Sequence, residues 1–167
     1  MTNKRCFFVV GPEGSGTYMM AEALVEAGCS YIANEGNLEG VLPYCPDDTI
    51  VIRRSIPHRK EFIDLYTIAS IASQAGYDVL PIGILREPNA VRLSVYNRAA
   101  TIKKDVFENM IGAITCMAEL GSGFPILPIT YEAMIGSKGF REWLFREIGL
   151  PYPSNYIFLD QNGKYYE

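Results

Sequence analysis

One segment near the N-terminus constrains the fold more than any other: a short apolar run, then a glycine-rich turn, then a helical pattern. The run Cys6-Phe7-Phe8-Val9-Val10 is β-rich and continuously apolar, which is typical of a strand buried in a parallel sheet. The turn, residues 11–17, reads Gly-Pro-Glu-Gly-Ser-Gly-Thr, and we call it the glycine loop. Helical spacing follows from about Thr17 to Ala27. This order predicts a phosphate-binding turn, because glycines let backbone N–H groups approach an anion and a helix N-terminus adds positive potential.

Strand-like and helix-like segments alternate along the rest of the chain. Further strands are expected at residues 49–52, 79–85 and 125–130, and further helices from after Pro57 to about Ala75, at 89–101, after Asp105 and at 138–148. The helix after Asp105 is expected to carry Phe107, Ile111, Ile114 and Met117 on one face, and residues 34–48 are expected to be irregular. This alternation predicts an α/β fold, a three-layer P-loop NTPase-like arrangement with a mostly parallel sheet and helices on both faces. The length of 167 residues fits a single domain, 1–167, with an irregular, tyrosine-rich tail at 151–167.

Composition argues against several classes of protein. Hydrophobic residues make up 49% and charged residues 20% of the chain, so disorder is not expected. No apolar run approaches the ~20 residues that span a bilayer, and no signal-peptide core is present, so we expect a cytoplasmic protein without a membrane span. Four widely spaced cysteines and a single histidine match no metal template, so we expect no metal site and free thiols.

The net charge is unevenly distributed. The overall value of −4 argues against a nucleic-acid-binding protein. Residues 53–104 nevertheless hold nine basic and four acidic residues, a net charge of +5. A basic middle in an acidic chain indicates a local anionic ligand, although charges on solvated helix faces would give the same pattern.

The glycine loop departs from the usual nucleotide-binding sequence. It resembles G-x-x-x-x-G-K-S/T, but Thr17 stands where the lysine would be. That lysine neutralises the β- and γ-phosphates in nucleoside triphosphate enzymes, so its absence disfavours an ordinary ATPase, GTPase or kinase.

A second motif follows the strand that is expected at residues 79–85. Arg86 leaves the end of this strand, and Ser94 lies eight residues later on the next helix. Both side chains can reach the carboxyl edge of the sheet, where open α/β folds bind ligands. Arginine binds phosphate through paired hydrogen bonds, and serine adds a hydroxyl donor.

Together, the two motifs resemble those of P-loop sulfotransferases, and most of all a small phage and bacterial branch whose loop reads G-P-E-x-S-G-T. In that family the 5′-phosphosulfate loop ends in S-G-T, here Ser15-Gly16-Thr17. The 3′-phosphate motif reads R-x-P with a serine eight residues after the arginine, here Arg86, Pro88 and Ser94. Residues 129–134 and Gly149-Leu150-Pro151 are similar to the closing part of the family, so the resemblance spans most of the chain.

The resemblance implies an enzyme that transfers a sulfuryl group from 3′-phosphoadenosine 5′-phosphosulfate (PAPS) to a hydroxyl or amine, without a metal. The product of the donor is adenosine 3′,5′-bisphosphate (PAP), and the acceptor would be a carbohydrate or another small hydroxyl compound. By resemblance, the 5′-phosphosulfate would be held by Gly14, Ser15, Gly16 and Thr17, and the 3′-phosphate by Arg86 and Ser94.

One departure from the family concerns catalysis. Many members carry a lysine just before S-G-T, and here that position is Gly14, so another cation must support the departing phosphate. Arg53, Arg54 and Arg59 are the candidates, and we predict Arg54 as the catalytic cation. The single histidine, His58, is the predicted general base, because an imidazole titrates near neutral pH. Glu13 is a weaker candidate base, and Lys164 could return to the donor.

Two alternatives stay open at this stage. One is a P-loop nucleotide or small-molecule kinase with an unusual loop, against which the missing lysine counts. The other is a non-catalytic nucleotide-binding protein of the same fold. The sequence names neither the acceptor nor the oligomeric state.

Overall fold

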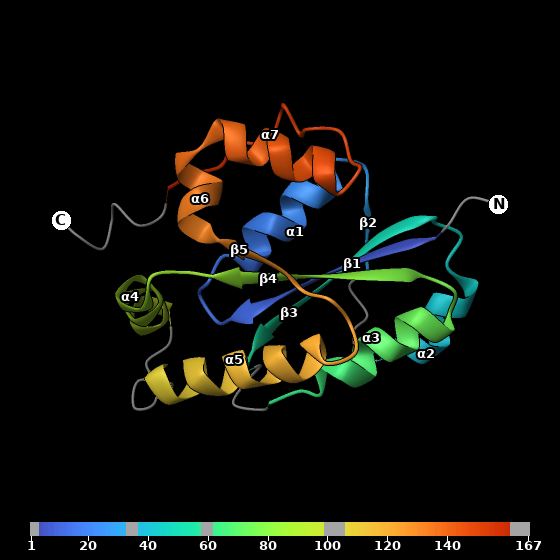
Figure 1. Ribbon diagram of the computed structural model, residues 1–167, viewed down its shortest axis with the longest axis horizontal. Coiled ribbons are helices and arrows are strands. Elements are labelled where there is room, and N and C mark those ends of the chain that lie inside the picture. Colours follow the sequence, from blue (N-terminus) through green and yellow to red (C-terminus); the bar gives the residue numbers. More distant parts are fainter. Residues whose placement is uncertain (1–3, 33–36, 58–61, 99–105, 161–167) are drawn as a thin grey trace.

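A five-stranded parallel sheet forms the centre of the molecule, as seen in the computed structural model, which describes residues 4–32, 37–57, 62–98 and 106–160 (Figure 1). The strands run in the order β2-β3-β1-β4-β5, and every neighbouring pair is parallel. Their bounds are β1 Arg5–Pro12, β2 Ser30–Tyr31, β3 Thr49–Ile56, β4 Asp78–Leu85 and β5 Leu127–Thr130. The predicted α/β fold with a parallel sheet is therefore confirmed.

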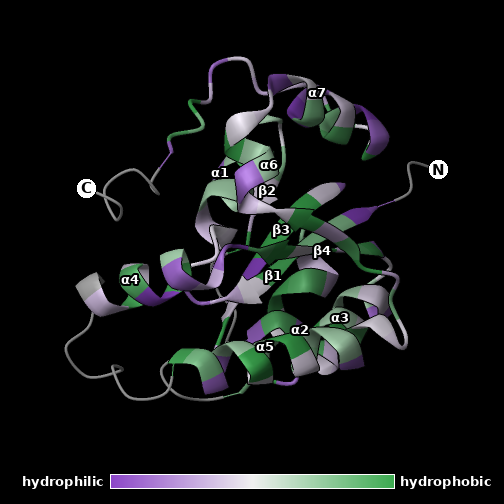
Figure 2. Ribbon diagram, turned by 60° about the vertical axis from the view of Figure 1, so that its left-hand side comes forward, coloured by the Kyte–Doolittle hydropathy of each residue, from purple (hydrophilic) through white to green (hydrophobic). Residues whose placement is uncertain are grey.

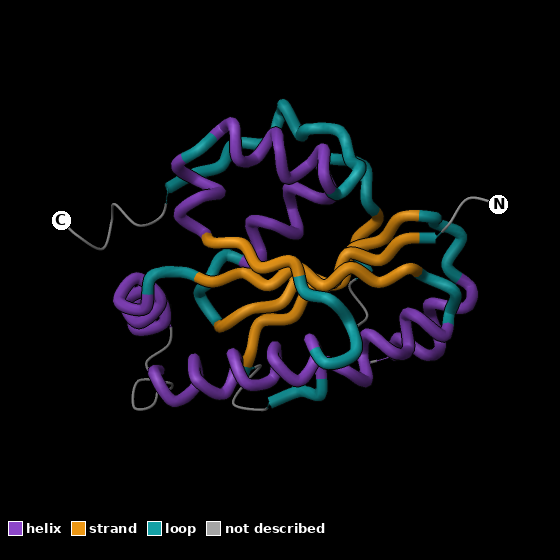
Figure 3. Tube along the Cα trace, in the orientation of Figure 1, coloured by secondary structure: helices purple, strands orange, loops and turns teal. Residues whose placement is uncertain are grey.

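Helices cover both faces of the sheet, which gives three layers (Figures 1 and 3). One face carries α1 (Thr17–Glu26), α6 (Tyr131–Gly136) and α7 (Lys138–Glu147). The other carries α2 (Leu38–Val41), a short 3₁₀ helix (Leu42–Tyr44), α3 (Leu65–Gln74) and α5 (Val106–Gly121). The remaining helix, α4 (Pro88–Arg98), stands beyond the carboxyl end of β4. No helix among the described residues is long and apolar enough to cross a membrane.

The central strand β1 explains the two-sided core. Phe7 and Val9 pack into the cluster on the α1 face, whereas Phe8 and Val10 pack into the cluster on the α5 face. All four are buried, since successive side chains of a strand point to opposite faces and both faces are covered. Figure 2 shows the hydrophobic residues concentrated in the sheet. The glycine loop therefore starts from the central strand of the sheet, which is buried on both faces.

β3 is longer than the sequence predicted, and this matters for the site. It continues through residues 53–55, which pair with Val9, Val10 and Gly11 of β1. The extension keeps Arg53 and Ser55 on one face of the sheet and places Arg54 on the other.

Two helices on the α5 face also differ from expectation. The helix expected directly after Pro57 begins only at Leu65, because Asp64 caps it by accepting hydrogen bonds from the Thr67 N–H (3.0 Å) and hydroxyl (2.7 Å). In α5, Met117 is buried with Ala113 and Leu120, but Phe107, Ile111 and Ile114 are exposed, so the four residues do not share the core face. The predicted cap of this helix, Asp105, lies outside the described residues. Residues 34–48, expected to be irregular, include α2 and the 3₁₀ helix.

Candidate functional site at the glycine loop

The glycine loop turns the chain from β1 into α1 with a backbone that requires glycine. Gly14 and Gly16 have φ values of 82° and 102°, in the left-handed region that other residues rarely adopt. The turn is closed by a hydrogen bond from the Ser15 N–H to the Pro12 carbonyl oxygen (3.0 Å) and tied to β3 by one from the Glu13 N–H to the Ile56 carbonyl oxygen (3.0 Å). Its shape is therefore fixed before any ligand binds.

Several backbone N–H groups of the loop are left for a ligand. Gly16 is the N-cap of α1 and no side chain caps this helix. Within the described residues, the N–H groups of Gly14, Gly16 and Thr17 form no hydrogen bond. Free N–H groups at a helix N-terminus form an anion-binding site, because they add to the positive end of the helix dipole.

The N-terminus of α4, by contrast, is already occupied. The Glu87 carboxylate accepts hydrogen bonds from the Asn89 N–H (3.0 Å) and the Ala90 N–H (2.7 Å). Pro88, which has no N–H, is the first residue of this helix. An anion at this edge of the sheet is therefore directed to α1 and not to α4.

The two sequence motifs meet at Gly14. The Arg86 guanidinium donates a hydrogen bond from Nη1 to the Gly14 carbonyl oxygen at 2.8 Å. Ser94 Oγ lies 3.4 Å from the point that a Cβ on Gly14 would occupy. Both side chains are buried, with exposed fractions of 7% for Arg86 and 0% for Ser94. The structure thus brings together Gly14, Arg86 and Ser94, which the resemblance assigned to one ligand.

Two buried hydroxyls in this region have no hydrogen-bond partner among the described residues, Ser15 Oγ and Ser94 Oγ. The two hydroxyls lie at different places relative to the loop. Ser15 Oγ lies beneath the loop, 2.6 Å from the point that a Cβ on Gly11 would occupy, whereas Ser94 Oγ lies beside Gly14. An unpaired buried hydroxyl destabilises the folded state by about 1–3 kcal/mol, and Ser94 Oγ beside Gly14 is thus able to donate to a ligand oxygen.

Tyr131 holds the loop and Arg86 together, a role that sequence reasoning missed. Its buried ring leaves no room for a side chain at Gly16, where a Cβ would lie 2.6 Å from Tyr131 Cδ2. The Arg86 guanidinium lies 4.2 Å from the centre of the same ring, and the Tyr131 hydroxyl donates to the Leu159 carbonyl oxygen at 3.2 Å. The position of Tyr131 directly after a parallel strand was the available signal, because such residues gather at the carboxyl edge of the sheet.

A polar connection links the first turn of α1 to β3. Ser55 Oγ lies 2.8 Å from Thr17 Oγ1, and Arg53 Nη1 donates to Ser55 Oγ at 3.2 Å. The Arg53 guanidinium also lies 5.7 Å from the centre of the Tyr18 ring. Ser55 was not singled out from the sequence, since its role depends on the extension of β3 past residue 52.

The positive charge of Arg53 is not balanced by an ion pair within the described residues. Its Nε is buried without a hydrogen-bond partner in the described part of the chain. A cation placed beside the N-terminus of a helix is repelled by the helix dipole. An anion bound between Arg53 and the loop would remove this repulsion.

The other predicted residues are placed as follows. Arg54, the predicted catalytic cation, lies on the opposite face of β3 from Arg53 and Ser55. His58, Arg59 and Lys164 lie outside the described residues. Within the described residues no group of three or more His, Cys, Asp or Glu side chains is arranged to hold a metal ion.

The chain matches no protein-family model, and no curated protein matches it significantly.

Proposed function

We propose that the protein binds PAPS at the glycine loop and transfers its sulfuryl group to a hydroxyl acceptor. The observation that carries this proposal is the meeting of the loop with Arg86 and Ser94. A fully buried serine hydroxyl, unpaired among the residues that the structure describes, lies beside Gly14, whose carbonyl oxygen accepts a hydrogen bond from Arg86. Two clusters of anion-binding groups at one sheet edge suit a nucleotide that carries a phosphate at each of two positions.

Each group has a role that follows from its chemistry. The free N–H groups at residues 14, 16 and 17 would bind the 5′-phosphosulfate, and Arg86 and Ser94 would bind the 3′-phosphate. As the acceptor oxygen bonds to sulfur, the bond between sulfur and the bridging oxygen of the 5′-phosphate breaks. Negative charge then grows on the departing phosphate, where preorganised donors and a cation lower the barrier.

Arg53 is the described cation best placed for this last task, because Ser55 links it to Thr17 at the N-terminus of α1. Arg53 would take the role of the lysine that many members of the family carry where this chain has Gly14. Whether His58 is the general base stays a prediction.

The first experiment is a thermal-shift comparison of PAP, adenosine 5′-monophosphate, ATP and GTP, each with and without Mg²⁺. At a 100-fold excess over its Kd a ligand adds about 2.7 kcal/mol of stability. For a chain of this size that corresponds to roughly 5–11 °C in Tm. We expect PAP to give this shift without Mg²⁺, and the monophosphate to give much less because it lacks the 3′-phosphate.

A kinase and a non-catalytic nucleotide-binding protein would give different results in these experiments. Arg86→Ala should remove most of the difference between PAP and the monophosphate. A shift with a triphosphate and Mg²⁺ alone would overturn the proposal in favour of a kinase. Binding of PAP and PAPS without release of PAP in the presence of any acceptor would indicate the non-catalytic nucleotide-binding protein.

A further inference from the structure

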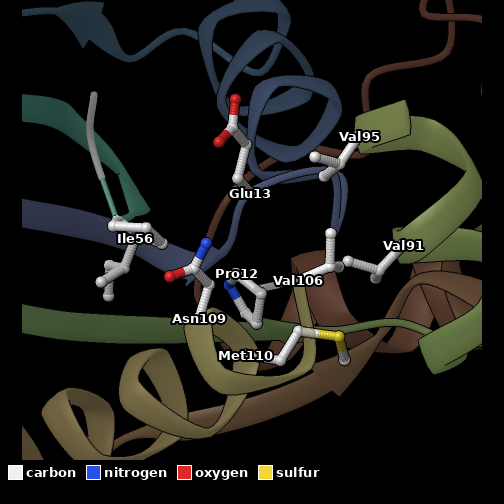
Figure 4. A pocket seen from close by; sticks show the side chains of 9 residues that line it. Pro12, Glu13, Ile56, Val91, Val95, Val106, Asn109 and Met110 are labelled. Carbon is white, nitrogen blue, oxygen red and sulfur yellow. The ribbon is translucent and has the colours of Figure 1, made fainter. Parts of the chain in front are cut away.

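Two hollows on opposite sides of the sheet differ greatly in size. The hollow between the glycine loop, α4 and α5 has a volume of about 10 Å³, room for about one water molecule, and Figure 4 shows the Glu13 carboxylate pointing away from it. A second hollow, which we call the α1 groove, has a volume of about 450 Å³ and lies along the outer side of α1. Only the second volume is in the range of sites for small organic molecules.

The lining of the α1 groove is both aromatic and acidic. It comes from α1, from β2 and from the segment after α7, and includes Tyr18, Glu22, Val25, Glu26, Tyr31 and Tyr156. The α1 side chains among these repeat every three or four positions, so they lie along one face of the helix. No basic residue lines the groove in the described part of the chain.

Glu22 connects two of the tyrosines. The Tyr156 hydroxyl donates to Glu22 Oε2 at 3.1 Å, and a hydrogen bond to Glu22 raises the pKa of the Tyr18 hydroxyl. Neither Glu22 nor Glu26 forms an ion pair within the described residues. The groove therefore presents two carboxylates whose negative charge is not balanced by a neighbouring cation.

The two carboxylates lie at the unfavourable end of α1. Glu26 is the last residue of the helix, Glu22 is about one turn before it, and the last turn holds no basic residue. The negative end of a helix dipole repels a carboxylate and attracts a cation. With Arg53 beside its N-terminus, α1 has charges near both ends that are the reverse of those that stabilise a helix. A cation bound in the groove would remove the repulsion at the C-terminal end.

The tyrosine rings favour the same kind of ligand. A cation over the face of an aromatic ring is attracted by the ring quadrupole, and ammonium groups are bound in this way. Tyr18 and Tyr31 are available for such a contact, with exposed fractions of 62% and 40%. The Arg53 guanidinium already lies 5.7 Å from the centre of the Tyr18 ring, so a bound cation is expected farther along the groove, beside Glu22 and Glu26.

The spacing of the two carboxylates indicates two positive charges on one ligand. Residues four positions apart on a helix are neighbours, with Cβ atoms about 6 Å apart. In 1,4-diaminobutane the two ammonium groups are separated by about this distance. The methylene chain between them has an apolar partner in Val25, which is exposed at the same face of α1.

We propose that the α1 groove binds a small organic dication, an aliphatic diamine whose ammonium groups pair with Glu22 and Glu26 while its methylene chain lies against Val25 and Tyr31. This site is separate from the glycine loop, and binding there does not require PAPS.

The test measures the Kd of 1,4-diaminobutane for the whole protein by titration calorimetry at physiological ionic strength. Three other probes separate charge from shape: butylamine has one ammonium group, 1,4-butanediol has none, and Mg²⁺ has the same charge but no apolar chain. Butylamine should bind about fivefold more weakly or worse, because a single exposed ion pair contributes up to that factor. We expect no measurable binding of the diol or of Mg²⁺.

Five variants test the contacts. Glu22→Gln should raise the Kd for the diamine by at least about fivefold, and Glu26→Gln should raise both the Kd and the Tm of the ligand-free protein, because it removes the repulsion by the helix dipole. Tyr31→Ala should raise the Kd by about two- to fivefold, whereas Tyr31→Phe keeps the ring and should leave it unchanged. Glu119→Gln is the matched control, since it removes an exposed carboxylate near the C-terminus of α5, on the other face of the sheet.

The outcomes distinguish a diamine site from general attraction to an acidic protein. Equal binding of 1,4-diaminobutane and Mg²⁺, or an equal loss in Glu119→Gln and Glu26→Gln, would overturn the proposal in favour of non-specific attraction. Binding of the diol as tightly as the diamine would make the groove a site for uncharged molecules and also overturn it. Failure of the wild-type protein to bind the diamine would refute the proposal and leave the one for PAPS untouched.

Discussion

Removing the Ser94 hydroxyl should change stability and ligand binding in opposite directions. Ser94 is fully buried on α4 and its Oγ has no hydrogen-bond partner among the described residues. Ser94→Ala removes an unsatisfied polar atom and leaves a void of only one hydroxyl oxygen, so the ligand-free protein should gain about 1–2 kcal/mol. That gain corresponds to an increase in Tm of roughly 2–8 °C for a protein of this size.

The PAP complex should lose stability in the same variant. A hydrogen bond to a charged group contributes about 1.5–3 kcal/mol, so loss of the bond from Ser94 to the 3′-phosphate should raise the Kd for PAP by roughly 10- to 150-fold. At a PAP concentration of 100 times the wild-type Kd, a 100-fold weaker variant would gain only about 0.4 kcal/mol from the ligand. The thermal shift produced by PAP should therefore nearly disappear.

Two further serines provide the controls. Ser15 Oγ is also buried and unpaired in the described residues, but it lies beneath the loop against Gly11. Ser15→Ala should raise the Tm of the ligand-free protein and keep most of the shift with PAP. Ser122→Ala should change neither, because that exposed hydroxyl already donates to the Glu119 carbonyl oxygen at 2.7 Å.

The decisive measurement is the sign of each change in Tm, recorded by thermal melting with and without PAP. A Ser94→Ala protein that melts lower than wild type without ligand would show that the hydroxyl is satisfied in the free protein. A variant with an unchanged shift in PAP would show that Ser94 does not contact the ligand. Either result refutes the assignment.

Three further predictions follow from the same contacts. Arg53→Gln should weaken PAP binding by about tenfold or more, the loss of one charge-assisted hydrogen bond, whereas the exposed Arg146→Gln should leave the Kd from titration calorimetry unchanged. Gly16→Ala should lower the free energy of unfolding by more than about 1 kcal/mol and abolish the PAP shift, because φ is 102° and the new Cβ would meet the Tyr131 ring; equal melting of variant and wild type would contradict this. Asp64→Ala should cost about 1 kcal/mol at neutral pH through loss of the α3 cap. Hydrogen bonds from Thr67 lower the pKa of Asp64, so this contribution is present at neutral pH and lost as the pH falls through that pKa; a cost that persists in acid, measured by denaturant unfolding, would exclude the cap as its source.

The fold was predictable where one local pattern decides it. The continuous, β-rich apolar run at residues 6–10 predicted a strand covered on both faces, and β1 is the central strand. The glycine loop and the α1 helix followed from the same segment. β2 and α2 were missed because a two-residue strand and a four-residue helix have no periodicity to detect. The start of α3 was misplaced because Asp64 competes as a cap with the earlier Pro57.

The candidate site was predictable only in part, for a similar reason. Arg86, Ser94 and the glycines stand in motifs whose spacing can be read along the chain, and the structure brings them together. Tyr131 acts through contacts with residues more than 40 positions away, which no local pattern reveals. Which of Arg53 and Arg54 lies on the α1 face could not be read from the sequence, because the two differ only in which covered face of β3 they occupy. That choice depends on the register with β1.

The glycine at position 14, where related loops carry a lysine, is connected with the position of Arg53 on β3. A side chain at Gly14 would require a φ of 82°, and its Cβ would meet Ser94 at 3.4 Å. Glycine at position 14 lets the loop keep this φ in contact with Ser94, and a lysine there would strain the backbone beside the hydroxyl that is proposed to hold the 3′-phosphate. The proposed cation then comes from another element, on the α1 face of the sheet. The extension of β3 provides it, because the pairing of Ser55 with Gly11 places the Ser55 hydroxyl between Arg53 and Thr17. In the proposed arrangement the cation is held by a strand and not by the loop, so introducing a lysine by Gly14→Lys, at a φ of 82°, should weaken PAP binding rather than strengthen it.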